Sequence, residues 1–164
     1  MRVNISKVEK DKKQYLELLL LADEQESMID RYLQKGDMYA LADPDVKGVC
    51  VVSDNGGGEY EIKNIAVAPS AQGRGYGKAM VEFVKRAYGE KCSRILVGTG
   101  DSPLTLPFYQ KCGFKKAFIK KNFFLDNYDH PIIEGGVQLV DMVYLTWTPD
   151  AGAGQAKRAE TPTE

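Results

Sequence analysis

A glycine-rich loop between an apolar run and an amphipathic stretch constrains the fold of this chain most. The loop is Gln72-Gly73-Arg74-Gly75-Tyr76-Gly77; the apolar run Ile62–Ala68 precedes it, and the amphipathic stretch continues to Tyr88. Glycine has no Cβ, so alternating glycines let a bulky anion approach the backbone closely. The first N–H groups of a helix have no intrahelical acceptor. A strand, this loop and a helix in that order therefore predict a phosphate site.

Two common phosphate-binding loops do not fit this spacing. A Walker-type loop ends in Gly-Lys-Ser or Gly-Lys-Thr, whereas Gly77-Lys78 is followed by Ala79, which has no hydroxyl for magnesium. A dinucleotide-binding loop would follow the first strand of the chain, with an acidic residue about 20 positions later that closes a second strand. Glu90 comes too early for that and follows no predicted strand. Both classes of nucleotide-binding loop are therefore disfavoured.

The pattern that remains is Gln-x-x-Gly-x-Gly after a segment of the form Glu-Ile-x-x-Ile-Ala-Val. It resembles the acyl-CoA-binding motif of the GNAT superfamily of N-acetyltransferases. Residues 108–114, Phe-Tyr-Gln-Lys-Cys-Gly-Phe, are similar to the second signature of that family, and Tyr109 lies 32 residues after Gly77. The resemblance covers about residues 59–118. It implies an α/β fold with a mixed, largely antiparallel sheet of six or seven strands, flanked by about four helices.

The resemblance also implies which residues bind the coenzyme. Acetyl-CoA would be the acyl donor, held mainly by backbone N–H groups of the loop, with charge from Arg74 and Lys78. The pantetheine would run beside residues 65–67 like an extra strand, and Ser102 stands where the family usually has a coenzyme-binding asparagine. The coenzyme-binding residues expected on this basis are Ile65, Ala66, Val67, Gln72, Gly73, Arg74, Gly75, Tyr76, Gly77, Lys78 and Ser102.

Acetyl transfer needs a base, because an amine is protonated at neutral pH, and the base commonly acts through water. Similarity to the histone-acetyltransferase branch of the family implies Glu61 as the first candidate and Glu59 as the second. Tyr109, at the position of the family's tyrosine, would donate a proton or a hydrogen bond to the leaving thiolate. A backbone N–H near residues 65–67 would stabilise the oxyanion. A solvated glutamate and a core tyrosine are the alternatives without a catalytic role.

The activity implied is an N-acetyltransferase that acts on a primary amine of a small molecule or a protein by direct attack in a ternary complex. The alternative is a non-catalytic acyl-CoA-binding sensor or regulatory module with the same fold. In this family the first two helices and the last hairpin bind the acceptor, here residues 15–33 and 122–137. The second region mixes aromatic and acidic residues, which either hold a cationic amine or anchor a loop. The acceptor, the acyl-chain preference and the presence of a homodimer stay open.

The composition disfavours several other classes. Apolar residues make up 43% and charged residues 27% of the 164, which is typical of a globular protein, and no apolar run reaches the ~18 residues of a membrane span. With 22 basic and 23 acidic residues there is no polybasic field for nucleic acid. Cys50, Cys92, Cys112 and the single His130 show no metal-ligand spacing. Residues 1–8 lack a signal-peptide pattern. We expect a cytoplasmic protein without a metal, nucleic acid or membrane partner.

The periodicity of apolar residues predicts the order of the elements. Strands are expected at residues 2–8, 38–42, 48–52, 59–68, 94–98, 116–124 and 137–147, and helices at 11–22, 25–34, from the glycine loop to 88, and from 102. Ser102 is expected to cap the last helix and Pro103 to begin it, although Pro107 favours a kink or a late start. Residues 1–148 should form one domain and residues 149–164 a flexible tail.

The strand expected at residues 59–68 contains a conflict of register. Ile62 falls on even parity and Ile65 and Val67 on odd parity, so a regular strand would place them on opposite faces. One extra residue near Lys63-Asn64 would bring all three to the same face, as a β-bulge does. The alternative is a strand that is buried on both faces. A bulge here would also separate this strand from the next one, which in the resembling family opens the slot for the thioester.

Overall fold

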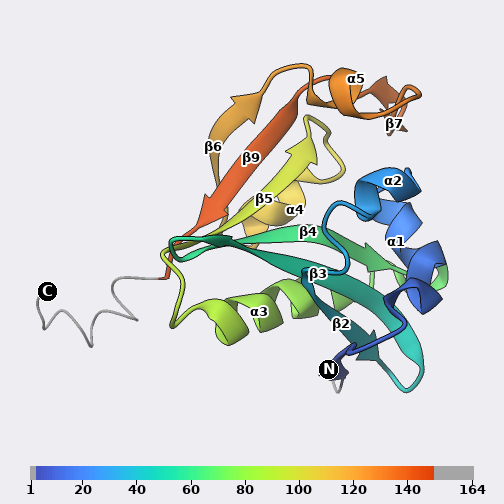
Figure 1. Cartoon of the computed structure of the whole chain (residues 1–164), viewed down its shortest axis with the longest axis vertical. Coiled ribbons are helices and arrows are strands. Elements are labelled where there is room, and N and C mark those ends of the chain that lie inside the picture. The colour runs from blue at the N-terminus through green and yellow to red at the C-terminus, as the bar shows by residue number, and fades with distance from the viewer. Residues whose placement is uncertain (1–2, 150–164) are drawn as a thin grey trace, which may run out of the picture.

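A twisted sheet of seven strands forms the centre of the computed structural model, which describes residues 3–149 (Figure 1). The strand order is β1-β2-β3-β4-β5-β9-β6. Their bounds are β1 Asn4–Lys7, β2 Asp37–Ala42, β3 Val46–Gly56, β4 Glu59–Val67, β5 Arg94–Gly100, β6 Lys115–Lys120 and β9 Met142–Trp147. Only β4 and β5 are parallel among the paired neighbours. The expected α/β fold with a largely antiparallel sheet is confirmed.

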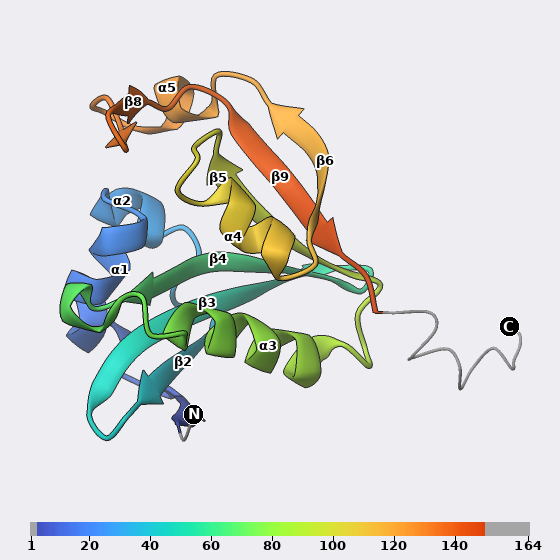
Figure 2. The same ribbon diagram turned by 180° about the vertical axis from the view of Figure 1, so that it is seen from behind.

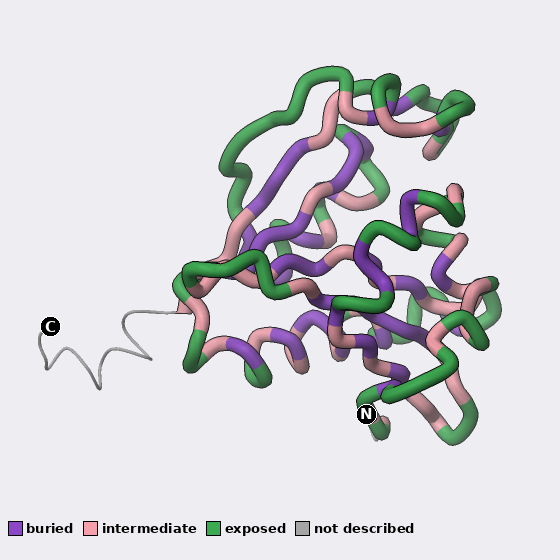
Figure 3. The backbone as a smooth tube through the Cα atoms, viewed as in Figure 1, coloured by how far each residue is buried: buried purple, intermediate pink, exposed green. Residues whose placement is uncertain are grey.

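Helices cover both faces of this sheet (Figures 1 and 2). The α-helices are α1 Leu16–Ala22, α2 Glu26–Ile29, α3 Tyr76–Tyr88, α4 Leu106–Lys111 and α5 Phe123–Asn127, and short 3-10 helices lie at Lys12–Tyr15 and Pro69–Ala71. The α3 and α4 side chains share one core with the sheet, whereas α1 and α2 pack in a second core against β2, β3 and β4. Among the described residues, the longest continuously buried run is 48–52 in β3, and buried stretches also follow β5 and β9 (Figure 3).

The bulge expected in β4 is confirmed. Val52 of β3 pairs with Ile62 and the preceding Val51 pairs with Asn64, so Lys63 is the extra residue. As a result, Ile62 and Ile65 contribute to the same core on the α3 side of the sheet. Pairing between β4 and β5 runs only from Glu59 to Ile62 and stops at the bulge, and beyond it the two strands diverge (Figure 1).

The predicted start of the α4 helix at Ser102 is wrong, and the helix begins at Leu106. Residues 103–105 form turns, in which Leu104 donates its N–H to the Ser102 hydroxyl and Leu106 donates its N–H to the Ser102 carbonyl. Pro107 lies in the first turn of the helix, where a proline removes no intrahelical hydrogen bond. Pro107 therefore follows the first residue of the helix and does not kink it, and the late start expected as an alternative is confirmed.

The region between β6 and β9 also differs from the prediction. The strand expected at 116–124 ends at Lys120, and residues 123–127 form α5, because Phe124 packs with Ile132 and Leu139 in a small third cluster. The strand expected at 137–147 is interrupted: β8 Val137–Gln138 pairs with β7 Ile133–Glu134, and β9 begins at Met142. We name residues 121–141 the cap. The cap lies over the same end of the sheet as α1 and α2 (Figure 1).

The flexible tail expected for residues 149–164 lies outside the described residues except for Pro149. The second helix, expected over 25–34, is α-helical only to Ile29 and continues as turns to Gly36. Across residues 3–149, none of the helices has the length and apolar character needed to cross a membrane.

Candidate functional site

A cavity of about 460 Å³ lies where β4 and β5 diverge. It extends from the glycine loop at one end to the C-terminal end of α1 and the cap at the other. The lining from β4 and β5 consists of residues 62–67 and residues 97–100. The remaining lining residues are Leu21, Ala22, Asp23, Glu24, Gln72, Leu104, Thr105, Tyr109, Phe124, Tyr128, Ile132, Ile133, Glu134, Leu139 and Met142.

The glycine loop presents a row of unpaired backbone donors at the start of α3. Gly73 has φ 78° and Gly75, the N-cap of α3, has φ 88°, a left-handed conformation that favours glycine. Within residues 3–149, the N–H groups of residues 73–78 have no hydrogen-bond acceptor, and the first N–H in this region that does is that of Ala79, bonded to Gly75. Such a cluster of N–H groups at a helix N-terminus suits a diphosphate.

The side chains of the loop are ordered by contacts to a neighbouring turn. Tyr76 is buried and donates its hydroxyl to Asp43 at 2.5 Å. The guanidinium of the exposed Arg74 lies over the Tyr76 ring and donates to the Tyr76 hydroxyl at 3.1 Å. Lys78 is exposed. Positive charge is therefore present beside the loop N–H groups, and the Tyr76 side chain itself is engaged in packing.

The edge of β4 that faces the cavity has unpaired backbone groups beyond the bulge. Ala68 donates its N–H to Lys47 at the start of β3. Since backbone groups alternate between the two edges of a strand, the N–H groups of Val67 and Ile65 point to the opposite edge, toward β5. Gln72 donates its side-chain amide to the Val67 carbonyl at 3.1 Å, on that same edge. An extended ligand can therefore bind beside residues 65–67 as an additional strand would.

Tyr109 of α4 lines the cavity with a side chain that is only 6% exposed. Its ring packs edge-on against Phe108 and Phe114 in the main core. Its hydroxyl has no hydrogen-bond partner among residues 3–149. Burial, and to a lesser extent the nearby Cys112, raises the pKa of Tyr109 above its ordinary value. The hydroxyl is therefore protonated at neutral pH and available to donate a hydrogen bond to a ligand.

The two candidate bases lie near the start of β4. Glu61 is buried, accepts a hydrogen bond from Asn55 at 3.0 Å and pairs with Lys63 at 3.2 Å. It does not line the cavity, although Lys63 does. Glu59 pairs with Arg94 at 2.6 Å, and the hydrogen bond from Asn55 is the largest influence that holds its pKa below the ordinary value. Glu59 is therefore a weaker base than an ordinary glutamate.

The structure brings five of the predicted site residues to the cavity: Ile65, Ala66, Val67, Gln72 and Tyr109. The loop residues 73–78 continue from Gln72, outside the cavity lining. Ser102 is 1% exposed and does not reach the cavity, because its hydroxyl accepts the N–H of Leu104 within the turn before α4. Glu61 lies outside the cavity lining, but it forms an ion pair with Lys63, which lines the cavity.

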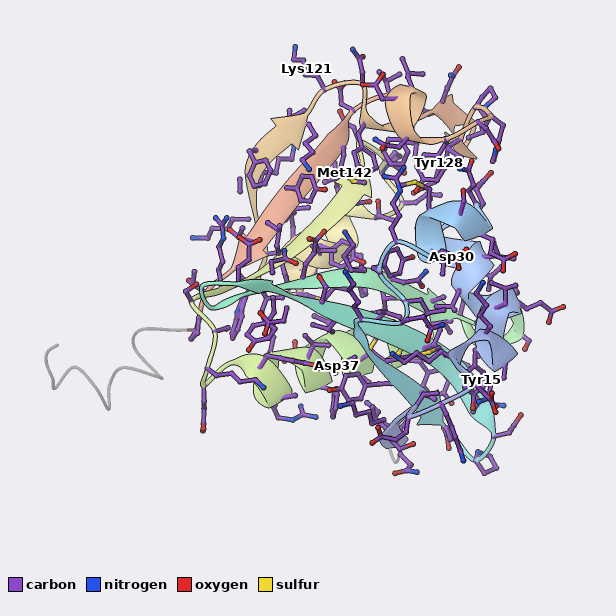
Figure 4. All side chains as sticks on the ribbon, viewed as in Figure 1. Tyr15, Asp30, Asp37, Lys121, Tyr128 and Met142 are labelled. Carbon is purple, nitrogen blue, oxygen red and sulfur yellow. The ribbon has the colours of Figure 1, made fainter. Side chains whose placement is uncertain are left out.

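The end of the cavity away from the glycine loop is polar. Asp23, just after α1, accepts hydrogen bonds from Tyr128 of the cap at 2.6 Å and from Tyr32 at 2.9 Å. Asn64, just after the bulged residue, donates to Tyr32 at 3.1 Å and to the Leu19 carbonyl at 3.0 Å. Figure 4 labels Tyr128, which lies on the side of α5 that faces α1 and α2. Three separate segments thus meet through one hydrogen-bond network.

Sequence reasoning did not select Asp23 or Asn64 as site residues. Asn64 carried a local signal, because it is a polar residue close to the apolar Ile62 and Ile65 in β4. Asp23 carried only the ambiguous signal of a polar residue at the end of a helix. Its role depends on Tyr128, which is 105 positions away in the sequence.

Comparisons with known proteins agree with this arrangement. Residues 34–116 match the family described as the acetyltransferase (GNAT) domain. An uncharacterized N-acetyltransferase, YvbK from Bacillus subtilis (strain 168), is 42% identical over 132 residues, which cover 79% of this chain and 85% of that protein. A crystal structure of a GNAT family acetyltransferase from Elizabethkingia anophelis with acetyl-CoA bound has 36% identity and a TM-score of 0.84, covering 89% and 97% of the two chains. A Bacillus subtilis acetyltransferase in complex with CoA has 37% identity and a TM-score of 0.81, covering 90% and 99%.

Proposed function

Because this chain belongs to the GNAT acetyltransferase family of acyl-CoA-dependent N-acetyltransferases, we propose that it transfers an acetyl group from acetyl-CoA to a primary amine of a small molecule or a protein. The amine attacks directly in a ternary complex. The relatives solved with acetyl-CoA or CoA support the donor. The observation that carries the proposal is the row of N–H groups at residues 73–78, which have no acceptor within residues 3–149 and which adjoin the cavity at Gln72.

The residues present fit the coenzyme. The N–H groups of residues 73–78 would hold the diphosphate, with Arg74 and Lys78 adding positive charge. Residues 65–67 would bind the pantetheine along the open edge of β4, and the N–H of Ile65 or Val67 would donate to the carbonyl oxygen as it becomes negative. A ligand bound in this way runs from the glycine loop toward Tyr109, as the cavity does.

The reaction then assigns roles to two side chains. The amine nitrogen forms a bond to the acetyl carbon, the bond from that carbon to sulfur breaks, and the amine loses a proton. Glu61 would receive that proton through water. Tyr109 would donate a hydrogen bond to the departing thiolate. Because the pKa of Tyr109 is raised and that of a thiol is about 8.5, complete transfer of its proton to sulfur is unfavourable, so the thiolate takes its proton from solvent.

A non-catalytic acyl-CoA sensor with this fold is not favoured. The relative with 42% identity is named as an N-acetyltransferase. A sensor also has no need of a phenol that is buried in the core, faces the cavity and keeps its proton. Binding of acetyl-CoA without turnover on any amine would support the sensor.

Coenzyme binding and thiol release test the proposed function together. We expect acetyl-CoA to bind the wild-type protein in calorimetry, and thiol to be released when amines, peptides or aminoglycosides are added. Gly75→Val should abolish binding, because a β-branched side chain at φ 88° distorts the turn that presents the N–H groups.

Gly57→Val is the matched control. Gly57 also has a positive φ, 64°, but it lies in the β3–β4 turn and a Cβ there meets no atom within 4 Å. The control shares the backbone strain and should retain coenzyme binding. Equal affinity for acetyl-CoA in Gly75→Val and the wild type would remove the glycine loop from its proposed role.

A further inference from the structure

Acidic side chains dominate the charged lining of the cavity at the end away from the glycine loop. Asp23 and Glu24 follow α1, and Glu134 belongs to β7 of the cap. Lys63 is the one basic side chain among the described lining residues, and its ammonium is engaged with Glu61 at 3.2 Å. Glu24 pairs with His130 at 3.1 Å. Asp23 and Glu134 form no ion pair with any residue from 3 to 149, so their charges are not directly compensated.

Asp23 has hydrogen bonds but no cationic partner. Both of its carboxylate oxygens accept from tyrosine hydroxyls, which are neutral donors. A carboxylate oxygen has two acceptor sites, so each oxygen keeps one for a ligand. Burial raises the pKa of Asp23 above its ordinary value, and the hydrogen bonds from the two tyrosines, followed by the nearby Lys63 and Arg31, lower it by less. A half-buried carboxylate held by two tyrosines in a cavity is poised to bind a positive group.

Two buried polar atoms without a partner provide an independent observation. They are Oδ1 of Asn64 and Oε2 of Glu134, the only such side-chain atoms among the described residues. Both residues line the cavity, and Asn64 is 3% exposed. The Asn64 amide is oriented by its own donors, since Nδ2 donates to the Leu19 carbonyl, so Oδ1 is the acceptor that is left over. Both unsatisfied atoms are acceptors, so what each of these two cavity-lining residues lacks is a hydrogen-bond donor.

We propose that Asp23 and Glu134 form an anionic subsite that binds a positively charged group of the acceptor, so that the preferred acceptor is an amine carrying a second cationic group. The subsite rests on the proposed function, because it shares the cavity with the acetyl-transfer site. An ammonium brings three N–H donors and one positive charge, and both carboxylates line the cavity without a cationic partner among residues 3–149. One cationic group would bind here while the reacting amine, in its neutral form, reaches the thioester near residues 65–67.

Aromatic side chains around the subsite suit the same ligand. Phe124 and Tyr128 both line the cavity, and their rings are stacked at 5.7 Å. Aromatic faces attract ammonium groups and accept the methylene chain that joins two amines. An anionic acceptor would meet the two carboxylates without a basic residue to offset them. One end of the cavity would thus favour a positively charged group of the acceptor, and the reacting amine would meet the thioester at the other end.

Matched pairs of amines test the subsite. We would compare α,ω-diaminoalkanes of three to eight carbons with the n-alkylamines of equal length in the acetyl-CoA thiol-release assay. At least one diamine should exceed its matched monoamine in kcat/KM by roughly tenfold or more, the effect of one charge-assisted hydrogen bond. Glu134→Gln and Asp23→Asn should each reduce this preference by a similar factor and leave the acetyl-CoA affinity unchanged. A wild-type protein that shows no preference for any diamine would overturn the proposal.

A control and a second readout separate this proposal from the proposed function. Asp126→Asn removes one charge from the cap at an exposed residue outside the cavity lining, and should keep the preference. Calorimetry of the same diamines with the protein–CoA complex measures the subsite without turnover. If no amine is acetylated but a diamine binds this complex and Glu134→Gln weakens that binding, the subsite stands and the catalytic proposal fails. If diamines and monoamines bind equally, the subsite is disproved, whatever the turnover.

Stability provides the check on a purely structural role. Glu134 has a buried oxygen without a partner, so Glu134→Gln should not lower the thermal midpoint. Asp23→Asn weakens two tyrosine hydrogen bonds and should lower it. A loss of diamine preference in Glu134→Gln at an unchanged thermal midpoint therefore reports recognition. A preference retained in Glu134→Gln excludes that residue from the subsite.

Discussion

Tyr109 serves two purposes in the same side chain. Its ring is part of the main core, in edge contact with Phe108 and Phe114, and its hydroxyl faces the cavity without a protein partner within residues 3–149. The packed ring holds the hydroxyl in one place, which is what a donor to a developing charge requires. The interpretation as a core aromatic and the interpretation as a catalytic residue are therefore compatible.

Tyr109→Phe should separate the two purposes. Phenylalanine keeps the ring and its packing, so we expect the thermal midpoint and the acetyl-CoA affinity to stay near the wild-type values. The turnover number should fall on the order of a hundredfold, because the hydrogen bond to the departing thiolate is lost. Steady-state thiol release and calorimetry measure the two quantities.

Tyr60→Phe is the control for this change, since Tyr60 also packs against the main core but does not line the cavity. Equal turnover in Tyr109→Phe and the wild type would assign Tyr109 to packing alone.

Glu61→Gln, with Glu59→Gln as its control, tests the base in the same assay. Unchanged turnover in Glu61→Gln would rule out Glu61.

At the scale of elements, Lys12 satisfies carbonyl groups of the turns that follow α2. After Ile29 the backbone continues as turns, and the ammonium of Lys12 donates to the carbonyls of Leu33 at 3.0 Å, Gln34 at 3.2 Å and Gly36 at 2.7 Å. These carbonyls have left the α-helical pattern, and a basic side chain satisfies carbonyl groups at a helix end. The 3-10 turn before α1 and the end of the α2 region are thus held together by one residue.

Lys12→Met should destabilise the protein. Methionine keeps the length of the side chain but loses three hydrogen bonds, so we expect the free energy of unfolding to fall by about 1 to 2 kcal/mol. Urea denaturation measures the difference. Lys10→Met is the control, since Lys10 is exposed and donates no side-chain hydrogen bond to a residue between 3 and 149. Equal unfolding midpoints for Lys12→Met and Lys10→Met would contradict the capping role.

At the scale of the whole molecule, distant parts of the chain close the cavity. The cap has its own small apolar cluster and is joined to the α1–α2 region by several polar contacts. Tyr128 donates to Asp23, Asp129 donates its N–H to Gln25 at 2.9 Å, and Arg31 donates to Asn127 at 3.0 Å. His130 lies between Glu24 at 3.1 Å and Asp129 at 2.6 Å. The cap and the α1–α2 region therefore jointly form the end of the cavity away from the glycine loop.

His130 is the only histidine, so its NMR titration reports this contact directly. The hydrogen bond to Asp129, followed by that to Glu24, raises the pKa of His130 above 6.5. A raised pKa in the folded state stabilises the contact below about pH 6.5, and this stabilisation disappears as the pH rises through the folded-state pKa. We expect the His130 Hε1 resonance to titrate above 6.5, and Glu24→Gln to lower that pKa. Glu26→Gln should leave it unchanged, because Glu26 pairs with Lys13. A titration at or below 6.5 in the wild type would show that the contact does not persist.

The sequence by itself determined the features that depend on neighbours along the chain. The glycine loop, the β4 bulge and the Tyr109 motif each follow from residue types within a few positions, because φ preference, strand parity and helix capping act locally. The start of α4 stayed open in the sequence, because Ser102 is a capable cap whereas Pro107 favours a kink or a late start, and only the packing of Leu106 and Tyr109 into the core decides it. Local propensity also favoured a strand at Phe123–Phe124, where contacts with Ile132 and Leu139 stabilise a helix.

Only the tertiary structure decided which residues line the end of the cavity away from the glycine loop. Asp23 meets Tyr128 across 105 positions, and Asn64 meets Leu19 and Tyr32 across 45 and 32 positions. Glu134 is one acidic residue among several in the cap until the fold buries one of its oxygens without a partner. Desolvation and hydrogen-bond satisfaction depend on what surrounds a side chain in space, and no pattern along the chain encodes those surroundings.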